Sequence, residues 1–317
     1  MPLTKYARHC AGVLLLLGLL GCALTPQVAS LRENPAILPP RAELASVPFF
    51  PQETHQCGPA SLAMAANFAG VAVSADALTA QTYLPDRQGS LQAEMLAATR
   101  RQGLLAYPLA PSLKDLLAEV AAGSPAIVLQ NLGLAAFPKW HYAVVIGYDL
   151  EREQVVLRSG LEPRQILSFR TFEHTWARSG YWAMLAMLPT RLPATADETR
   201  YVGAALALEQ TGQMESALVA YQAALSRWPR NLTARMGLGN TAYASGDRQL
   251  AETAFRQAAA DHPHEWMPLN NLAYVLADLQ RYAEALSAAR QSLALAGPEN
   301  TTARETLHEI QNRAVRH

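Results

Sequence analysis

The stretch Val47-Pro-Phe-Phe-Pro-Gln52-Glu-Thr-His-Gln-Cys57-Gly-Pro-Ala-Ser-Leu62 is the most informative part of the sequence. The Gly-Pro pair and the apolar residues after it predict a buried helix, because proline fits the first turn of a helix. Cys57 then stands at the helix N-terminus, where the dipole and free N–H groups favour a thiolate. A thiolate is a nucleophile, and the Gln52 amide has suitable spacing to donate to an oxyanion beside the Cys57 N–H. Cys57 is therefore a candidate nucleophile and Gln52 a candidate oxyanion donor.

A base for Cys57 should come from another element, and the stretch Trp140-His-Tyr-Ala-Val-Val-Ile-Gly-Tyr-Asp149 offers His141. This histidine would begin a buried strand, and such a strand would hold a catalytic imidazole in a fixed position. Two other histidines compete: His55 lies on the nucleophile loop, and His174 lies near a helical segment. A purely structural role for all three also stays open. We expect His141 to be the base.

These two stretches together resemble the bacteriocin-processing (double-glycine leader) peptidases, through Gln-x₄-Cys-Gly-Pro-Ala-Ser and His-Tyr-Ala-Val-Val-Ile-Gly-Tyr-Asp. The resemblance covers about residues 45–187. It implies a papain-like fold and an enzyme that cuts peptide bonds with a Cys–His–Asp triad and an upstream glutamine. By this resemblance Cys57 is the nucleophile, His141 the base and Gln52 the oxyanion donor of a cysteine peptidase.

One position departs from the family pattern, because the aspartate that orients the histidine is replaced by Ser159. A serine can accept the imidazole N–H and hold the tautomer, but it cannot neutralise an imidazolium. Asp149 is the nearest carboxylate in sequence, yet it ends the histidine's own strand, roughly 25 Å away at about 3.3 Å per residue. An alternative is therefore a catalytically impaired adaptor that binds peptides and scaffolds an envelope complex. A cell-wall endopeptidase of another papain-like family is a third hypothesis, against which the Cys-Gly-Pro box argues.

The surrounding sequence predicts an α+β domain over residues 45–189, with helices first and strands afterwards. Buried or capped helices are expected after Gly58 and over 90–102 and 112–122. Runs rich in β-branched residues predict strands at 126–130, 142–148 and 154–158, with a further one over 181–187. Residues 190–197 are expected to be a linker.

Residues 198–317 are Ala-rich, strongly helical and repetitive. The glycines at 212 and 246 and Gln280 are 34 residues apart in turn, as are alanines 217, 251 and 285. This period resembles about three tetratricopeptide repeats, which form an all-α solenoid. We expect the small residues to let helices approach closely, and Tyr221 and Phe255 to fill the gap to the next helix. A protein partner, or the substrate, would bind to the repeats.

The N-terminus predicts export and lipid attachment. A short basic region with Lys5 and Arg8 precedes an apolar run over 13–20, which is too short to span a bilayer. Leu19-Leu-Gly-Cys22 resembles the lipobox of bacterial lipoproteins, which implies a signal peptide over 1–21 and acyl chains on Cys22. Residues 22–44 are rich in proline and are expected to form an extended tether. Ala23 favours the outer membrane facing the periplasm. Because Cys10 would leave with the signal peptide and Cys22 would carry the lipid, Cys57 would be the one free thiol of the mature protein.

Charge and motif content exclude several other functions. Lys plus Arg and Asp plus Glu are equal at 26 each, which argues against a broad nucleic-acid-binding surface. No phosphate-binding loop and no metal-ligand spacing is present, so neither a cofactor nor a metal is expected. The predicted partners are a peptide or protein substrate, a protein on the repeats, and the membrane through Cys22.

Overall fold

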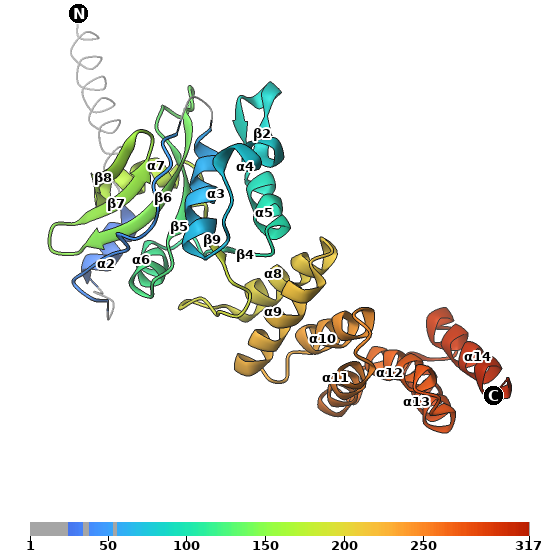
Figure 1. Ribbon diagram of the computed structural model, residues 1–317. Coiled ribbons are helices and arrows are strands. Elements are labelled where there is room, and N and C mark those ends of the chain that lie inside the picture. The colour runs from blue at the N-terminus through green and yellow to red at the C-terminus, as the bar shows by residue number, and fades with distance from the viewer. Residues whose placement is uncertain (1–24, 34–37, 53–55, 317) are drawn as a thin grey trace, which may run out of the picture.

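A computed structural model describes residues 25–33, 38–52 and 56–316. The N-terminal part is an α+β domain built on one large sheet, and a row of helices leads away from it to the C-terminus (Figure 1). Among the described residues, no helix combines the length and apolar character needed to span a membrane.

The large sheet has seven antiparallel strands in the order β4-β9-β5-β6-β7-β8, with β1 paired beside β6. The predicted strands at 126–130, 142–148, 154–158 and 181–187 are present, whereas β1, β4 and β8 were not predicted. Every residue of the two central strands β5 and β9 is buried, which explains their continuous apolar runs. The bounds are β1 Arg41–Glu43, β4 Leu105–Pro108, β5 Ala126–Asn131, β6 Trp140–Asp149, β7 Gln154–Ser159, β8 Glu162–Ser168 and β9 Ala183–Met187.

Helices cover both faces of this sheet (Figure 1). Along β5, Ile127 and Leu129 pack with the face that carries α3, α4 and α5, while Val128 packs with the face that carries α2, α6 and α7. A small hairpin follows α4 and leads into α5. The bounds are α2 Pro26–Glu33, α3 Cys57–Phe68, α4 Ala75–Thr82, β2 Tyr83–Leu84, η1 Pro85–Arg87, β3 Gly89–Ser90, α5 Gln92–Arg101, α6 Leu113–Ala121 and α7 Phe169–Ala177.

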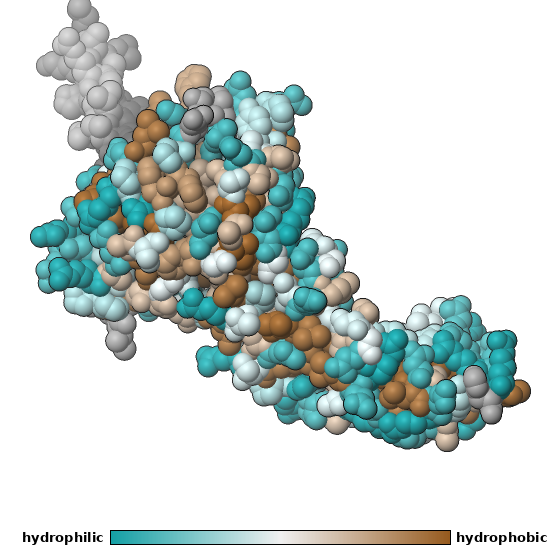
Figure 2. Space-filling model, in the orientation of Figure 1, coloured by the Kyte–Doolittle hydropathy of each residue, from teal (hydrophilic) through white to brown (hydrophobic). Residues whose placement is uncertain are grey.

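The C-terminal part consists of three helix pairs and a last helix, α14. Gln280 has a φ of 59°, close to the 78° of Gly212 and the 88° of Gly246, so the predicted repeat register holds although glycine is lost in the third copy. The visible surface of the last helices is mainly hydrophilic (Figure 2). The bounds are α8 Glu198–Gln210, α9 Met214–Arg227, α10 Leu232–Ala244, α11 Arg248–Asp261, α12 Trp266–Asp278, α13 Tyr282–Ala296 and α14 Thr301–Val315.

Small residues and aromatic rings meet inside the repeats as expected. A Cβ on Gly237 of α10 would lie 2.2 Å from the ring of Tyr221 on α9, and one on Gly239 would lie 2.4 Å from the ring of Phe255 on α11. Neither glycine could carry a side chain without moving an aromatic ring that is itself buried. The absence of a side chain therefore sets how closely α10 approaches both of its neighbours.

The expectation of an extended tether over 22–44 is wrong where the structure describes this segment. Residues 26–33 form α2, whose backbone N–H groups of Gln27 and Val28 donate to the buried carboxylate of Glu173 at 3.0 and 2.8 Å. Proline at the first position is compatible with a helix, and Glu173 supplies the missing N-terminal acceptor. Pro26 thus begins a docked helix instead of an extended chain. Cys22 and residues 1–21 lie outside the described residues.

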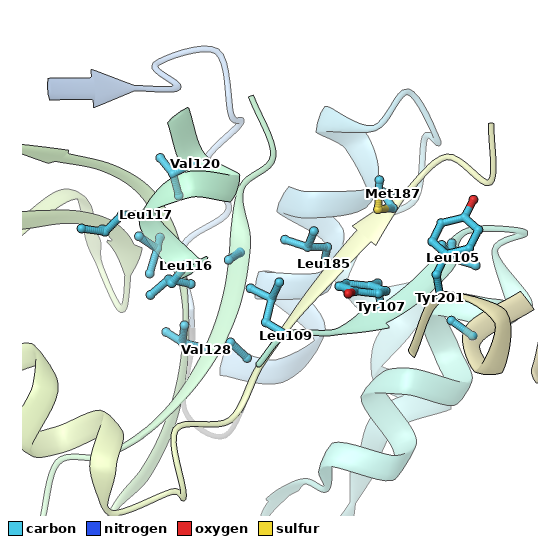
Figure 3. Close-up of a cluster of buried hydrophobic side chains, with 14 of the residues drawn as sticks. Leu105, Tyr107, Leu109, Leu116, Leu117, Val120, Val128, Leu185, Met187 and Tyr201 are labelled. Atoms are coloured by element: carbon cyan, nitrogen blue, oxygen red, sulfur yellow. The ribbon is translucent and has the colours of Figure 1, made fainter. Parts of the chain in front are cut away.

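Residues 190–197, expected to be a linker, are fixed to the α+β domain. Glu119 on α6 is 0% exposed and accepts hydrogen bonds from the backbone of Ala194 at 3.1 Å and from the backbone and hydroxyl of Thr195 at 2.7 and 2.6 Å. Tyr201 of α8 lies against Tyr107 of β4, with ring centroids 6.4 Å apart, in a cluster shared by the two parts (Figure 3). The sheet and the first repeat therefore share one hydrophobic core.

Candidate active site

Cys57 is the first residue of α3 and is largely enclosed. The backbone N–H groups of Tyr142, Gly58 and Cys57 itself act on the thiol by lowering its pKa. A Cβ on Gly58 would lie 2.6 Å from Ser90 Oγ of the β2–β3 hairpin, so this position needs glycine. The Cys-Gly-Pro sequence therefore lets the hairpin pack directly beside the thiol.

His141 lies near the start of β6, as predicted, and the structure brings it to Ser159. The His141 Nε2 atom is 2.9 Å from Ser159 Oγ, which lies at the end of the neighbouring strand β7 and is buried. The serine thus occupies the place at which a triad carboxylate would contact the ring.

Gln52 is held in place by its own hydrogen bonds. Its Oε1 atom accepts from the Gly160 N–H at 2.9 Å, and its backbone N–H donates to the Gly160 carbonyl at 3.0 Å. Its Nε2 atom donates to Ser61 Oγ at 3.1 Å and reaches the Tyr142 carbonyl at 3.4 Å. Gly160 follows Ser159 and has a φ of 60°, so one turn positions both the glutamine and the serine.

Cys57, His141 and Gln52 line one cavity of about 980 Å³. The same cavity is lined by Trp140, which is 51% exposed, and by Tyr142, whose ring meets Trp182 edge-on at 5.7 Å between centroids. The volume is large enough for several residues of an extended peptide.

Of the two competing histidines, the structure tests only His174. His174 lies on α7 and does not line this cavity. His55 lies outside the described residues. The described residues also hold no cluster of three or more His, Cys, Asp or Glu that could bind a metal ion.

The surroundings of Cys57 and His141 favour the neutral form of both side chains. Burial raises the pKa of the Cys57 thiol, and the three backbone N–H groups lower it by less. Burial, together with the charge of Lys139, lowers the pKa of His141 to about 4. The N–H groups at the helix start thus act in the expected direction, towards the thiolate, but burial has the larger effect and the pKa of the thiol is raised.

Several supporting residues were not predicted from the sequence. Ser61, on the turn of α3 after Cys57, and Gly160 hold the Gln52 side chain, and Trp182 packs on Tyr142. Ser61 was quoted as part of the Cys-Gly-Pro-Ala-Ser box, and that position was the available signal. The contacts of Gly160 and Trp182 depend on strand order, for which the sequence carries no local pattern.

Comparison with known proteins agrees with this architecture. Residues 44–184 match the model of the Peptidase_C39 like family, and residues 202–247 and 237–300 match the tetratricopeptide repeat. The chain therefore carries a C39-like peptidase domain followed by tetratricopeptide repeats, and the predicted fold class is confirmed. A search of curated proteins found no match.

Solved structures resemble each part separately. A C39-like peptidase from Bacillus anthracis is 21% identical, with 46% of this chain and 97% of that chain covered and a TM-score of 0.40. The first repeat domain of human RPAP3 is 17% identical, with 38% and 93% covered and a TM-score of 0.36. The Yersinia enterocolitica secretion chaperone SycD, in complex with a peptide of the translocator YopD, is 21% identical, with 36% and 92% covered and a TM-score of 0.34.

Proposed function

We propose that the C39-like domain of this chain is an active cysteine peptidase, with Cys57 as nucleophile and His141 as general base. The observation that carries the proposal is that Cys57, His141 and Gln52 line one cavity while His141 is hydrogen-bonded to Ser159. These side chains come from the loop before α3, from α3 itself and from two neighbouring strands, and no shared local structure requires them to meet.

The proposed reaction begins with a neutral pair. With the Nε2 proton donated to Ser159, the Nδ1 atom of His141 has a free lone pair for the thiol proton. The proton leaves Cys57 as its sulfur attacks the peptide carbonyl, so the imidazole acts as a general base during the attack. The Cys57 N–H would stabilise the oxyanion, joined by the Gln52 amide when one of its N–H groups gives up its 3.4 Å contact with the Tyr142 carbonyl. The protonated His141 then gives its proton to the leaving amine, and water releases the acyl group.

Ser159 is proposed as a positioning residue. A hydroxyl fixes the tautomer and orientation of His141 but supplies no negative charge to the imidazolium that forms. We therefore expect turnover to be slow compared with a peptidase that has a carboxylate at this place. This expectation also keeps the second candidate, an impaired peptidase-like adaptor, open to direct test.

The test is digestion of a proteome-derived peptide library with the full chain and with Cys57→Ala. New peptide termini produced by the wild type and missing from Cys57→Ala are the expected result. Identical products from both proteins would overturn the peptidase and favour the adaptor.

We further propose that the repeats bind a protein or peptide partner and that the chain is an envelope lipoprotein anchored at Cys22, facing the periplasm. The family match to tetratricopeptide repeats supports the first statement, and the Leu19-Leu-Gly-Cys22 stretch supports the second. Capture of partners on Cys57→Ala tests the repeats. Incorporation of labelled palmitate, lost in Cys22→Ala, tests the anchor.

A further inference from the structure

The cavity beside Cys57 has an uneven charge. Its wall includes the cations Arg87, Lys139 and Arg178, and no described residue of that wall is an aspartate or glutamate. The chain as a whole has equal numbers of acidic and basic residues, so this wall departs locally from the average. A cleft lined by one sign of charge attracts ligands of the opposite sign.

None of the three positive charges is neutralised by a carboxylate in the described part of the chain. Arg87 and Lys139 are exposed and form no salt bridge there. Arg178 donates from Nη1 to the carbonyls of Asn131 at 3.2 Å and Gly133 at 2.6 Å, which are neutral acceptors. The field of Lys139 also reaches the catalytic pair, since it contributes to lowering the pKa of His141.

The three cations lie on segments whose backbones are held by hydrogen bonds or by packing. Asn131 Oδ1 accepts from the N–H groups of Gly133 and Lys139, both at 2.9 Å, and closes the β5–β6 loop at its base. Arg178 spans the same loop from the end of α7. Arg87 belongs to the hairpin that packs against Gly58. The backbone positions of all three cations around Cys57 are thus fixed by the fold.

Two apolar side chains lie among these cations. Trp140 and Leu91 both line the cavity and are 51% and 46% exposed. A peptide in the cavity would bury these surfaces, which gains free energy in proportion to the apolar area removed from water. The wall thus combines positive charge with apolar contact.

We propose that this cleft selects acidic peptides, with an Asp or Glu side chain near the scissile bond beside a large apolar residue. The proposal rests on the proposed function and names the class of substrate that the reaction would use. It concerns recognition, so binding tests it separately from turnover.

The experiment uses the full chain carrying Cys57→Ala, which cannot form an acyl-enzyme, to capture peptides from a random decapeptide library. We expect Asp and Glu to be enriched in the bound fraction, with peptides containing Asp retained about fivefold better than Asn-matched peptides at low salt. The preference should weaken at high salt. The reversal Arg87→Glu should remove most of it, whereas Lys114→Glu, an exposed cation on α6 outside the cavity, should leave it unchanged.

An acidic content equal to that of the input library, or an enrichment that survives both Arg87→Glu and Lys139→Glu, overturns the proposal. The captured acidic peptides are then offered to the wild type. Capture without cleavage supports the acidic preference and contradicts the peptidase. Cleavage without an acidic preference supports the peptidase and contradicts the acidic preference.

Discussion

In the α+β domain two buried carboxylates each hold segments far apart in the sequence, whereas the carboxylates of the repeats lie on the surface. Glu173 caps α2 from 146 residues away, and Glu119 holds Thr195 from 76 residues away. In the repeats, Asp278 pairs with Arg248 and Arg313, 30 and 35 residues away. One part thus depends on a few buried long-range bonds, and the other on many similar contacts about one repeat apart.

The difference predicts where a single change costs most stability. A buried charge that satisfies several donors cannot be removed without leaving those donors unpaired, while an exposed ion pair exchanges readily with water. Helix packing in the repeats lies between these cases, because it depends on close approach and not on charge. Three of the four predictions below follow this order, and the remaining one concerns the catalytic pair.

Glu119→Ala should have the largest effect. It leaves the backbone N–H groups of Ala194 and Thr195 without their acceptor, and we expect a loss of about 3 kcal/mol in the free energy of unfolding. Guanidinium unfolding of the full chain measures it. Glu151→Ala, at an exposed glutamate, is the matched control and should change stability little. Equal effects of the two substitutions would contradict the role assigned to Glu119.

Gly237→Ala should cost about 2 kcal/mol, because the added methyl group would overlap the ring of Tyr221. Gly203→Ala in α8 is the control, since a Cβ there meets nothing within 4 Å. Alanine is the better helix former, so this control should gain up to about 1 kcal/mol. Thermal unfolding of both variants gives the comparison, and a shift of the same sign in both would show that Tyr221 does not limit the approach of α10.

Ser159→Asp tests whether a buried carboxylate can change the catalytic pair. A negative charge beside the ring should raise the pKa of His141 from about 4 and favour the imidazolium–thiolate pair. We expect iodoacetamide to alkylate Cys57 about tenfold faster at pH 7, which corresponds to one pKa unit. In the wild type, where burial raises the thiol pKa, the rate should rise mainly at alkaline pH; in the variant this rise should move to lower pH.

Ser159→Asn is the matched control for that prediction, because it has nearly the shape of aspartate without its charge. Its alkylation rate should stay near the wild-type value. If Asn accelerates alkylation as much as Asp, the change comes from geometry and not from charge.

Asp278→Asn should have the smallest effect. Its ion pairs with Arg248 and Arg313 are partly exposed, so we expect a loss of at most about 1 kcal/mol that shrinks as salt is added. Urea unfolding at low and high salt measures both quantities. A loss as large as that of Glu119→Ala, unaffected by salt, would remove the distinction between the two parts of the molecule.

The same distinction explains what could be predicted from the sequence. The repeats were predictable because each contact recurs at the same spacing, so Gln280 could be aligned with Gly212 and Gly246 and has their left-handed backbone. Cys57 and His141 were predictable because helix and strand starts have local signals. The docking of α2 and the Gln52–Gly160 bonds were not, since they join distant segments without a repeating pattern.

The ionisation of the site could not be predicted either, because it depends on burial. The position of Cys57 at a helix start indicated that N–H groups of α3 favour the thiolate, but the N–H of Tyr142 on β6 was not predicted, and desolvation by the surrounding chain has the larger effect on the thiol pKa. Ser159 was identified through the family resemblance, at the end of the strand that follows the histidine strand, and its distance of 2.9 Å to His141 became known only from the strand pairing.

The docking of α2 also determines how far the C39-like domain could reach from a membrane. An extended tether from Cys22 to Leu44 could span about 75 Å at about 3.4 Å per residue, but the described chain is already attached to the domain at Gln27. From Cys22 to Thr25 the chain spans about 10 Å at most. A lipid on Cys22 would therefore confine the C39-like domain to a thin layer at the bilayer surface, and any polypeptide that it binds would have to enter this layer.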